Sequence, residues 1–329
     1  MLPAGRGFTQ EWVSAFFGGV CRPENPDTPM STDTLDTYRH SGKFTVQGLL
    51  LPVAAAAVVG FPLGLAYAYL VRWIPFIYVN VLVTFGYAFA FGWLTTRLLK
   101  TGRVRNTVLA ATAGLVAGVL AVYWDWNGHV HVLFEDSPWF FLPGQILAAM
   151  GYLYDHGSWT IGHGGSPGDT VSGIPLAIVW VVEAGIIIGI AAYLPFKFVA
   201  DTPYCETTGT WLDVTKNIDT LDSIDDPAQV ALLKGGSLQP LLEAKARPVG
   251  SLIFTRLCLK RSAQPGPFCT LRVQKITIKI DKKGKSQETV KAYSGDLILP
   301  LSMFDLIAQF EDFKSTGNTR PGNAPAGAG

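Results

Sequence analysis

Long apolar runs dominate the chain up to about residue 200, and polar residues are confined between them. A helix of about 20 mainly apolar residues crosses a bilayer core about 30 Å thick. Four runs reach that length. We therefore predict a transmembrane domain at residues 44–199 with four spans, at residues 44–71, 74–96, 107–124 and 173–199.

A fifth apolar run, at residues 139–154, is shorter and contains Pro143, Gly144 and Gln145. A run of this length is typical of an interfacial or re-entrant helix rather than a span. It lies within residues 125–172, which we predict to be a linker between the third and fourth spans. The alternative, a fifth span, would place the charged C-terminal half outside and residues 155–172 inside without a basic residue, against the rule that basic loops stay in the cytoplasm.

Beyond residue 200 the pattern changes to short alternating segments separated by turns. This pattern predicts a soluble α+β domain at residues 200–316 and a disordered tail at residues 317–329. Residues 269–280 alternate, but their apolar positions change phase after Val273. We predict a bulge near Gln274–Lys275, because it would return Ile276 to the same buried face. The predicted fold class is therefore an all-α membrane domain followed by an α+β domain.

Composition and charge support a membrane protein and give it an orientation. Only 16% of the residues are charged and 49% are hydrophobic, against about 25% charged in soluble domains. Residues 97–106 hold four basic residues and no acid, whereas residues 125–172 hold five acids and no Lys or Arg. Basic loops stay in the cytoplasm. We predict a bacterial-type inner membrane, an outer linker, and a cytoplasmic location for the polar arm at residues 1–43 and for the C-terminus.

Glu183 is the one charged residue in the central parts of the four predicted spans. It lies about 15 Å from Gly173 at about 1.5 Å per residue, and such residues are candidates for a functional site. Asn80, Thr84 and Tyr87 share one face of the second span and are its predicted partners. The cluster is either a proton or cation site or a structural lock between two helices. The absence of a second charge in the spans favours the lock.

Three spans contain a G-x-x-x-G motif. Small residues four apart let helix backbones approach closely, which drives association in lipid. The motifs predict a compact bundle within one chain or between copies of it. They are Gly60/Gly64, Gly114/Gly118 and Gly185/Gly189.

Metal ligation is an open alternative. His129 and His131 would point to one side of an extended linker segment, near several carboxylates. Cys205, Cys258 and Cys269 resemble a zinc ribbon with too few ligands, since a structural zinc needs four. No complete metal motif is present, so solvated histidines and buried thiols are favoured, and no cofactor is predicted.

No catalytic triad, nucleotide fingerprint or haem motif is present, and the near-neutral charge gives no case for nucleic acid. An enzyme is therefore not favoured. We predict a non-catalytic integral membrane protein that anchors a cytosolic partner-binding domain, as a scaffold or assembly component of a membrane complex. Its partners would be the lipid bilayer, another protein or a second copy. The alternative is a small transporter, channel subunit or sensor that uses Glu183.

Overall fold

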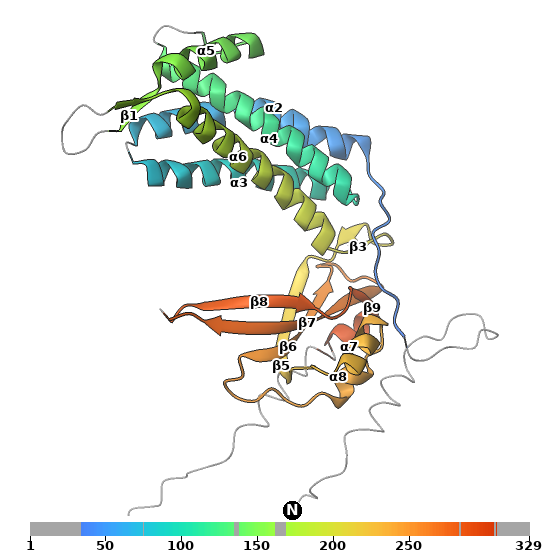
Figure 1. Ribbon diagram of the computed structural model, residues 1–329. Coiled ribbons are helices and arrows are strands. Elements are labelled where there is room, and N and C mark those ends of the chain that lie inside the picture. Colours follow the sequence, from blue (N-terminus) through green and yellow to red (C-terminus); the bar gives the residue numbers. More distant parts are fainter. Residues whose placement is uncertain are drawn as a thin grey trace, which may run out of the picture. The chain divides into compact units, whose positions relative to one another are not determined.

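The computed structural model describes residues 34–74, 76–134, 138–161, 169–282, 284–305 and 307. The predicted tail and the first 33 residues of the predicted arm lie outside these ranges. The chain forms two compact units (Figure 1). The helical unit is His40–Thr202, and the C-terminal unit joins the described residues up to Arg39 to those from Pro203 onward.

Four long helices build the helical unit and lie side by side in Figure 1. Among the described residues, these four are long and apolar enough to cross a membrane, so the chain is a multi-pass membrane protein. The largest interfaces join α2 to α4, α4 to α6 and α3 to α6. The helices are α2 (Val46–Trp73), α3 (Ile77–Thr101), α4 (Thr107–Leu133) and α6 (Gly173–Asp201).

The predicted linker is partly helical. The third predicted span ended at residue 124, but α4 continues to Leu133. Helix α5 (Pro143–His156) has 14 residues, begins with proline at its first position and lies at one end of the bundle in Figure 1. It is followed by a short antiparallel pair, β1 (Trp159–Ile161) and β2 (Asp169–Val171). We call this end of the bundle the distal end; it is formed by Trp73, Ile77, Leu133 and Gly173.

Four of the six motif glycines lie where helices touch. A Cβ atom at Gly64 would lie 2.4 Å from the Trp124 carbonyl oxygen, and one at Gly114 would lie 2.3 Å from the Ala191 carbonyl oxygen. Gly60 and Gly118 are similarly close to α4 and α6. By contrast, a Cβ atom at Gly185 or Gly189 would meet no atom of another described element within 4 Å. Those two glycines therefore leave one face of α6 open.

The C-terminal unit is built on a five-stranded antiparallel sheet in the order β5-β6-β7-β8, with β9 also paired to β7. Helices α7 (Pro227–Lys234) and α8 (Gln239–Glu243) accompany it, and β3 (Tyr204–Cys205) and β4 (Thr210–Trp211) form a separate hairpin. The core includes Leu257, Leu271, Leu297 and Phe304. The sheet strands are β5 (Val214–Asp222), β6 (Ile253–Arg261), β7 (Phe268–Ile280), β8 (Ser286–Ala292) and β9 (Leu297–Pro300).

The predicted bulge in β7 is wrong. The register between β6 and β7 is continuous from Ile253↔Thr277 to Lys260↔Thr270, and the irregularity lies in β5 instead. Because alternate residues of a strand point to opposite faces, the apolar residues of β7 change face along the strand. Leu271 and Val273 join the core, whereas Ile276, Ile278 and Ile280 lie on the other face of the sheet.

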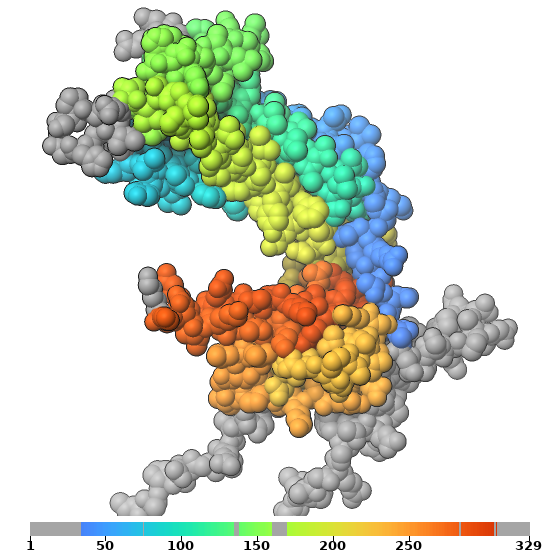
Figure 2. All heavy atoms as spheres, viewed as in Figure 1, coloured from blue at the N-terminus to red at the C-terminus, as the bar shows by residue number. Residues whose placement is uncertain are grey.

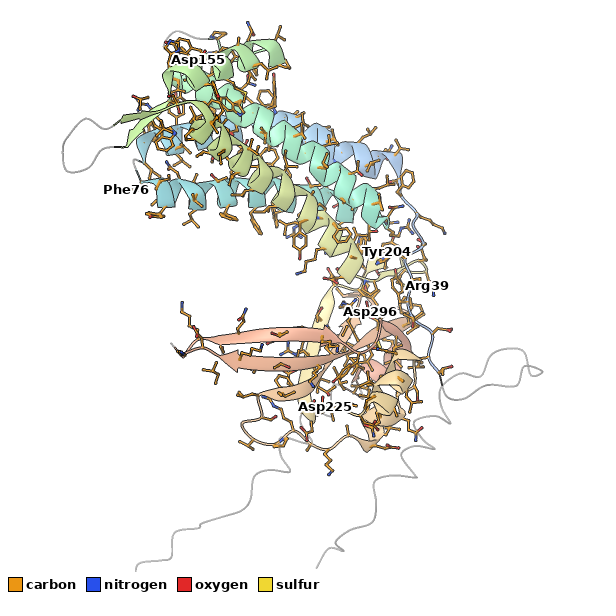
Figure 3. All side chains as sticks on the ribbon, viewed as in Figure 1. Arg39, Phe76, Asp155, Tyr204, Asp225 and Asp296 are labelled. Carbon is orange, nitrogen blue, oxygen red and sulfur yellow. The ribbon has the colours of Figure 1, made fainter. Side chains whose placement is uncertain are left out.

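Part of the polar arm is bound to the C-terminal unit. The Leu35 N–H donates to the Gly236 carbonyl at 3.0 Å, and the Tyr38 N–H donates to the Asp296 carbonyl at 2.7 Å. The Tyr38 hydroxyl accepts from the Tyr204 N–H at 2.9 Å and contacts the Tyr204 carbonyl at 3.2 Å. Figure 3 shows Tyr204 and Asp296 within this unit. Residues 34–39 therefore act as part of the C-terminal fold.

Glycine packing gives a direct test of the helical unit. Gly114→Ala places a methyl group against the backbone of α6, and overpacking of this kind costs about 1–3 kcal/mol. Gly185→Ala is the matched control in the same type of motif, and it should be neutral or stabilising by up to about 1 kcal/mol through helix propensity. Unfolding of both variants in mixed detergent micelles measures the difference. Equal stability of the two variants would contradict this packing.

Candidate functional site

A polar cluster lies among the four long helices of the helical unit. It comprises one residue of α2, two of α3, two of α4 and one of α6. At about 1.5 Å per residue its members lie about 6–15 Å from the distal end of their helices. The members are Tyr67, Thr84, Tyr87, Asp125, His129 and Glu183.

Helical spacing explains why these side chains converge. Thr84 and Tyr87 are three residues apart on α3, and Asp125 and His129 are four apart on α4, so each pair shares one helix face. Tyr67, Thr84, Tyr87 and Asp125 are all buried, with Tyr67 only 2% exposed. The Tyr67 ring stacks on the Tyr87 ring with centroids 4.6 Å apart. The close approach of α2 to α4 therefore carries polar groups into the bundle.

Tyr67 connects α6 to α3. Its hydroxyl is hydrogen-bonded to Glu183 Oε1 and lies 2.7 Å from Thr84 Oγ1. The Thr84 hydroxyl in turn donates to the Asn80 carbonyl at 3.0 Å. These contacts form a continuous chain from the carboxyl group of α6 to the backbone of α3.

Counting protons shows what this chain can hold. Its three contacts need three protons, but each hydroxyl supplies only one. With Glu183 ionised, Tyr67 donates to the carboxylate and Thr84 cannot donate fully to both of its neighbours. With Glu183 protonated, each group donates to the next and every contact has its proton. The chain is therefore complete when Glu183 carries one extra proton.

Asp125 supplies a second buried carboxylate, which the sequence assigned to the start of the linker. It is 3% exposed, and the His129 Nδ1–H donates to its Oδ1 at 2.7 Å. Both residues lie within electrostatic reach of Glu183. The inference that Glu183 is the only charge in the spans is therefore wrong, because α4 is longer than its apolar run.

The predicted pairing of His129 with His131 is also wrong. Both lie in α4 rather than in an extended segment, and residues two apart on a helix point in different directions. His129 faces Asp125, and His131 stacks on Trp139 with ring centroids 4.2 Å apart. The two imidazoles therefore belong to different environments.

The predicted partners of Glu183 are arranged differently from the simple face that the sequence suggested. Thr84 reaches Glu183 only through Tyr67, and the Tyr87 hydroxyl donates to the Ala121 carbonyl at 2.8 Å. Asn80 contributes its carbonyl, while its Oδ1 is buried with no hydrogen-bond partner in the described structure. Three residues of the cluster were not predicted from the sequence. Tyr67 has no distinguishing pattern around it, whereas Asp125 and His129 could have been found from their i, i+4 spacing.

The three cysteines of the C-terminal unit do not converge with other metal-binding side chains among the described residues. Across the described ranges, no group of three or more His, Cys, Asp or Glu residues could hold a metal ion. Cys205, Cys258 and Cys269 are buried free thiols in β3, β6 and β7. Burial raises the pKa of Cys258, and it raises the pKa of Cys269 to about 12. The zinc alternative thus rests on the sequence alone.

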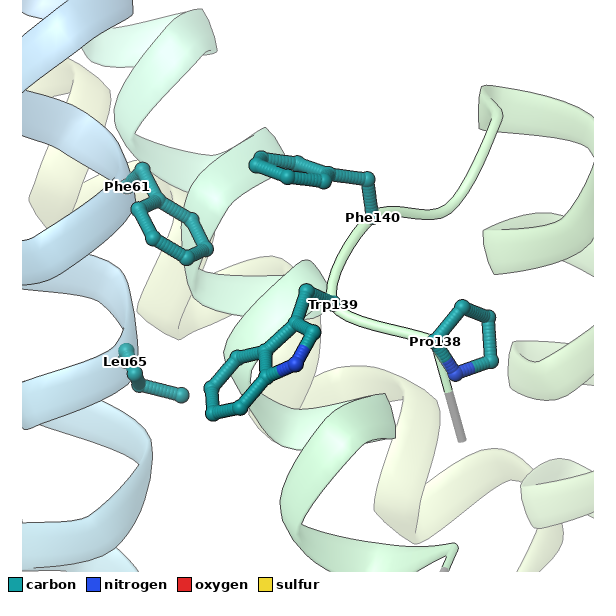
Figure 4. Close-up of a pocket in the computed structure, with 5 residues that line it drawn as sticks. All are labelled: Phe61, Leu65, Pro138, Trp139 and Phe140. Atoms are coloured by element: carbon teal, nitrogen blue, oxygen red, sulfur yellow. The ribbon is translucent and has the colours of Figure 1, made fainter. Parts of the chain in front are cut away.

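An apolar groove of about 620 Å³ lies outside this cluster, in the helical unit (Figure 4). It is lined by Phe61 and Leu65 of α2 and by Pro138, Trp139 and Phe140, which precede α5. None of these side chains is ionisable. The groove therefore offers no chemistry comparable to the polar cluster.

Comparisons with protein-family models, curated proteins and solved structures find no match to this chain. The functional argument therefore rests on the geometry of the polar cluster.

The Asp125–His129 pair can be tested through stability. His129→Ala leaves a carboxylate buried without its cation, a change that costs about 3–5 kcal/mol for fully buried pairs. Because the His129 side chain is 26% exposed, we expect about 2–3 kcal/mol. His131→Ala is the control and should cost less than about 1 kcal/mol. Unfolding in detergent measures both, and equal losses would contradict the buried pair.

The thiols give a second test. Because burial holds Cys258 and Cys269 protonated at pH values below their raised pKa, they should react slowly with maleimide near neutral pH. Denaturation should expose them and restore ordinary thiol reactivity. Mass spectrometry of labelled peptides measures each site. Rapid labelling of Cys269 in the folded protein would contradict its placement in the core.

Proposed function

We propose that the helical unit binds and releases a proton at Glu183, as the working site of a proton-linked transport or sensing protein. The hydrogen-bonded chain from Glu183 through Tyr67 to Thr84 is the observation that carries this proposal. It links α6, α2 and α3 through groups that can each pass a proton to the next.

Charge balance supports the same proposal. Asp125 and Glu183 contribute two negative charges, and His129 contributes at most one positive charge. An uncompensated charge in an apolar interior is costly, so one further proton on Glu183 neutralises the cluster. Proton relays in membranes are built from several titratable groups. Those facing Glu183 are Tyr67 from α2, Tyr87 from α3, and Asp125 and His129 from α4.

We place the protein in a bacterial-type inner membrane with both termini in the cytoplasm. The basic residues 97–106 support this orientation, as do the acidic residues of the linker. The cluster would then lie nearer the outer surface than the cytoplasm. A proton would enter from the distal end of the bundle.

A second candidate function is the anchoring of a partner-binding domain. Only Thr202 and Pro203 separate the end of α6 from β3, which favours a C-terminal unit held at the membrane. The open glycine face of α6, at Gly185 and Gly189, would suit a second copy or another membrane protein. In this scaffold function Glu183 would only fasten α6 to α2.

Infrared difference spectroscopy on the reconstituted protein separates the two functions. We expect a protonated carboxyl band that responds to a pH step, is absent in Glu183→Gln and is shifted in Tyr67→Phe. Proton uptake in liposomes, followed with a pH-sensitive dye, should fall at least about a hundredfold in Glu183→Gln, the lower end of the range for loss of one proton-transfer group.

Asp155→Asn is the control, because this exposed carboxyl lies in α5 rather than in the cluster. It should leave both signals unchanged. If Glu183→Gln folds normally and its carboxyl band and proton uptake equal those of the parent protein, the proton function is wrong and the scaffold function is favoured. Crosslinking to co-purified membrane proteins would then test the scaffold.

A further inference from the structure

The change of face along β7 creates an apolar surface on the side of the sheet away from the core. Ile276 pairs with Phe254 on β6 and with Val290 on β8. The next residue on the same face of β7 is Ile278. Its backbone N–H donates to the Leu252 carbonyl at 2.7 Å, which places Leu252 beside it. We call Leu252, Ile278, Ile280 and Val290 the hairpin surface.

The hairpin surface is exposed within the C-terminal unit. Ile280 is 59% exposed, Val290 is 50% exposed and Leu252 is 44% exposed. All seven residues of β8 are exposed. Figure 2 shows the β7–β8 hairpin projecting from the body of its unit. Clustered exposed apolar residues of this kind mark an interaction site.

Basic residues lie at the turn of the hairpin and on its opposite face. Residues 275–291 contain six lysines and two acids. One of the acids, Glu288, accepts a hydrogen bond from Arg256 at 2.5 Å, so its charge is compensated within the sheet. Exposed Lys282 and Lys285 lie in the turn between β7 and β8, whereas exposed Lys279 and Lys291 alternate with the apolar residues and point to the other face. An apolar hairpin surface next to a basic turn is suited to bind an anionic, partly apolar partner.

The membrane that the helices cross offers such a partner. The C-terminal unit follows α6 after two residues, so it is held close to the bilayer that the helices cross. The hairpin strand β8 of seven residues is about 23 Å long at about 3.3 Å per residue, and the hairpin projects from the body of its own unit. The cytoplasmic leaflet is negatively charged and attracts clustered lysines.

We propose that the hairpin surface binds anionic lipid at the membrane in which the helices lie. Ile280 and Val290 enter the interfacial region, and Lys282 and Lys285 contact lipid phosphates. Binding of nucleic acid would leave the apolar residues of the hairpin surface exposed to water. Binding of a soluble protein would make no use of the anionic leaflet, to which the short connection after α6 tethers the C-terminal unit. This inference is independent of the proton function.

The test uses the full chain in nanodiscs with a fluorophore at position 286. Ser286 is exposed and pairs with Ile280 on the hairpin, so Ser286→Cys reports on this surface. Cys21→Ser removes the remaining thiol outside the described residues, since the other cysteines are buried. Nitroxide-labelled lipid quenches the fluorophore only on close contact. We expect strong quenching in phosphatidylglycerol-rich discs and little in phosphatidylcholine discs.

Charge reversal tests the role of the lysines. Each lysine near an anionic surface changes binding about fivefold, so Lys279→Glu with Lys282→Glu and Lys285→Glu should reduce quenching to the phosphatidylcholine level. Lys234→Glu on exposed α7 is the control and should leave it unchanged. Glu183→Gln should also leave it unchanged, which separates this inference from the proton function.

Two results would overturn the proposal. Equal quenching in both lipid mixtures, or quenching that survives the triple reversal, excludes recognition of anionic lipid. Shielding of the fluorophore in detergent that rises with protein concentration would show that a second copy covers the hairpin surface.

Discussion

The constraint on which the helical unit depends is that polar groups inside apolar helices must find partners within the bundle. No water replaces a missing hydrogen bond there, and each unsatisfied group costs several kcal/mol by order of magnitude. The Tyr67 hydroxyl meets this demand for two helices at once, because it contacts Glu183 on α6 and Thr84 on α3. The glycine contact of α2 with Trp124 brings the backbones close enough for this arrangement.

The C-terminal unit solves a related problem in a different way. Several of its charged side chains are paired on the sheet: Arg256 of β6 binds Asp219 of β5 through two hydrogen bonds of 2.7 and 2.8 Å. Arg272 binds the buried Asp296, whose backbone carbonyl accepts from Tyr38. These pairs fix the strands and the first described residues together. The hairpin beyond them keeps an exposed apolar face, because none of the described helices of the unit covers it.

The sequence predicted well wherever one local property decided the outcome. The four apolar runs correspond to the four long helices, and the alternating segments beyond residue 200 correspond to a sheet domain. The errors arose at boundaries. Asp125 and His129 follow the apolar run of α4 and were assigned to a linker, although the helix continues past them. Likewise the phase change in β7 suggested a bulge, because one buried face was assumed for the whole strand.

Glu183 was identifiable from the sequence because a carboxylate in a long apolar run is conspicuous by composition alone. The role of Glu183 was not identifiable, since it depends on which side chains of other helices contact the carboxyl group. Tyr67 is one of several aromatic residues in the first span, and only the packing of α2 against α3 and α4, which brings its hydroxyl to Glu183 of α6, selects it. Local chemistry therefore determined the spans and the central residue. The tertiary structure decided the cluster, because long-range contacts between helices leave no periodic signal in the chain.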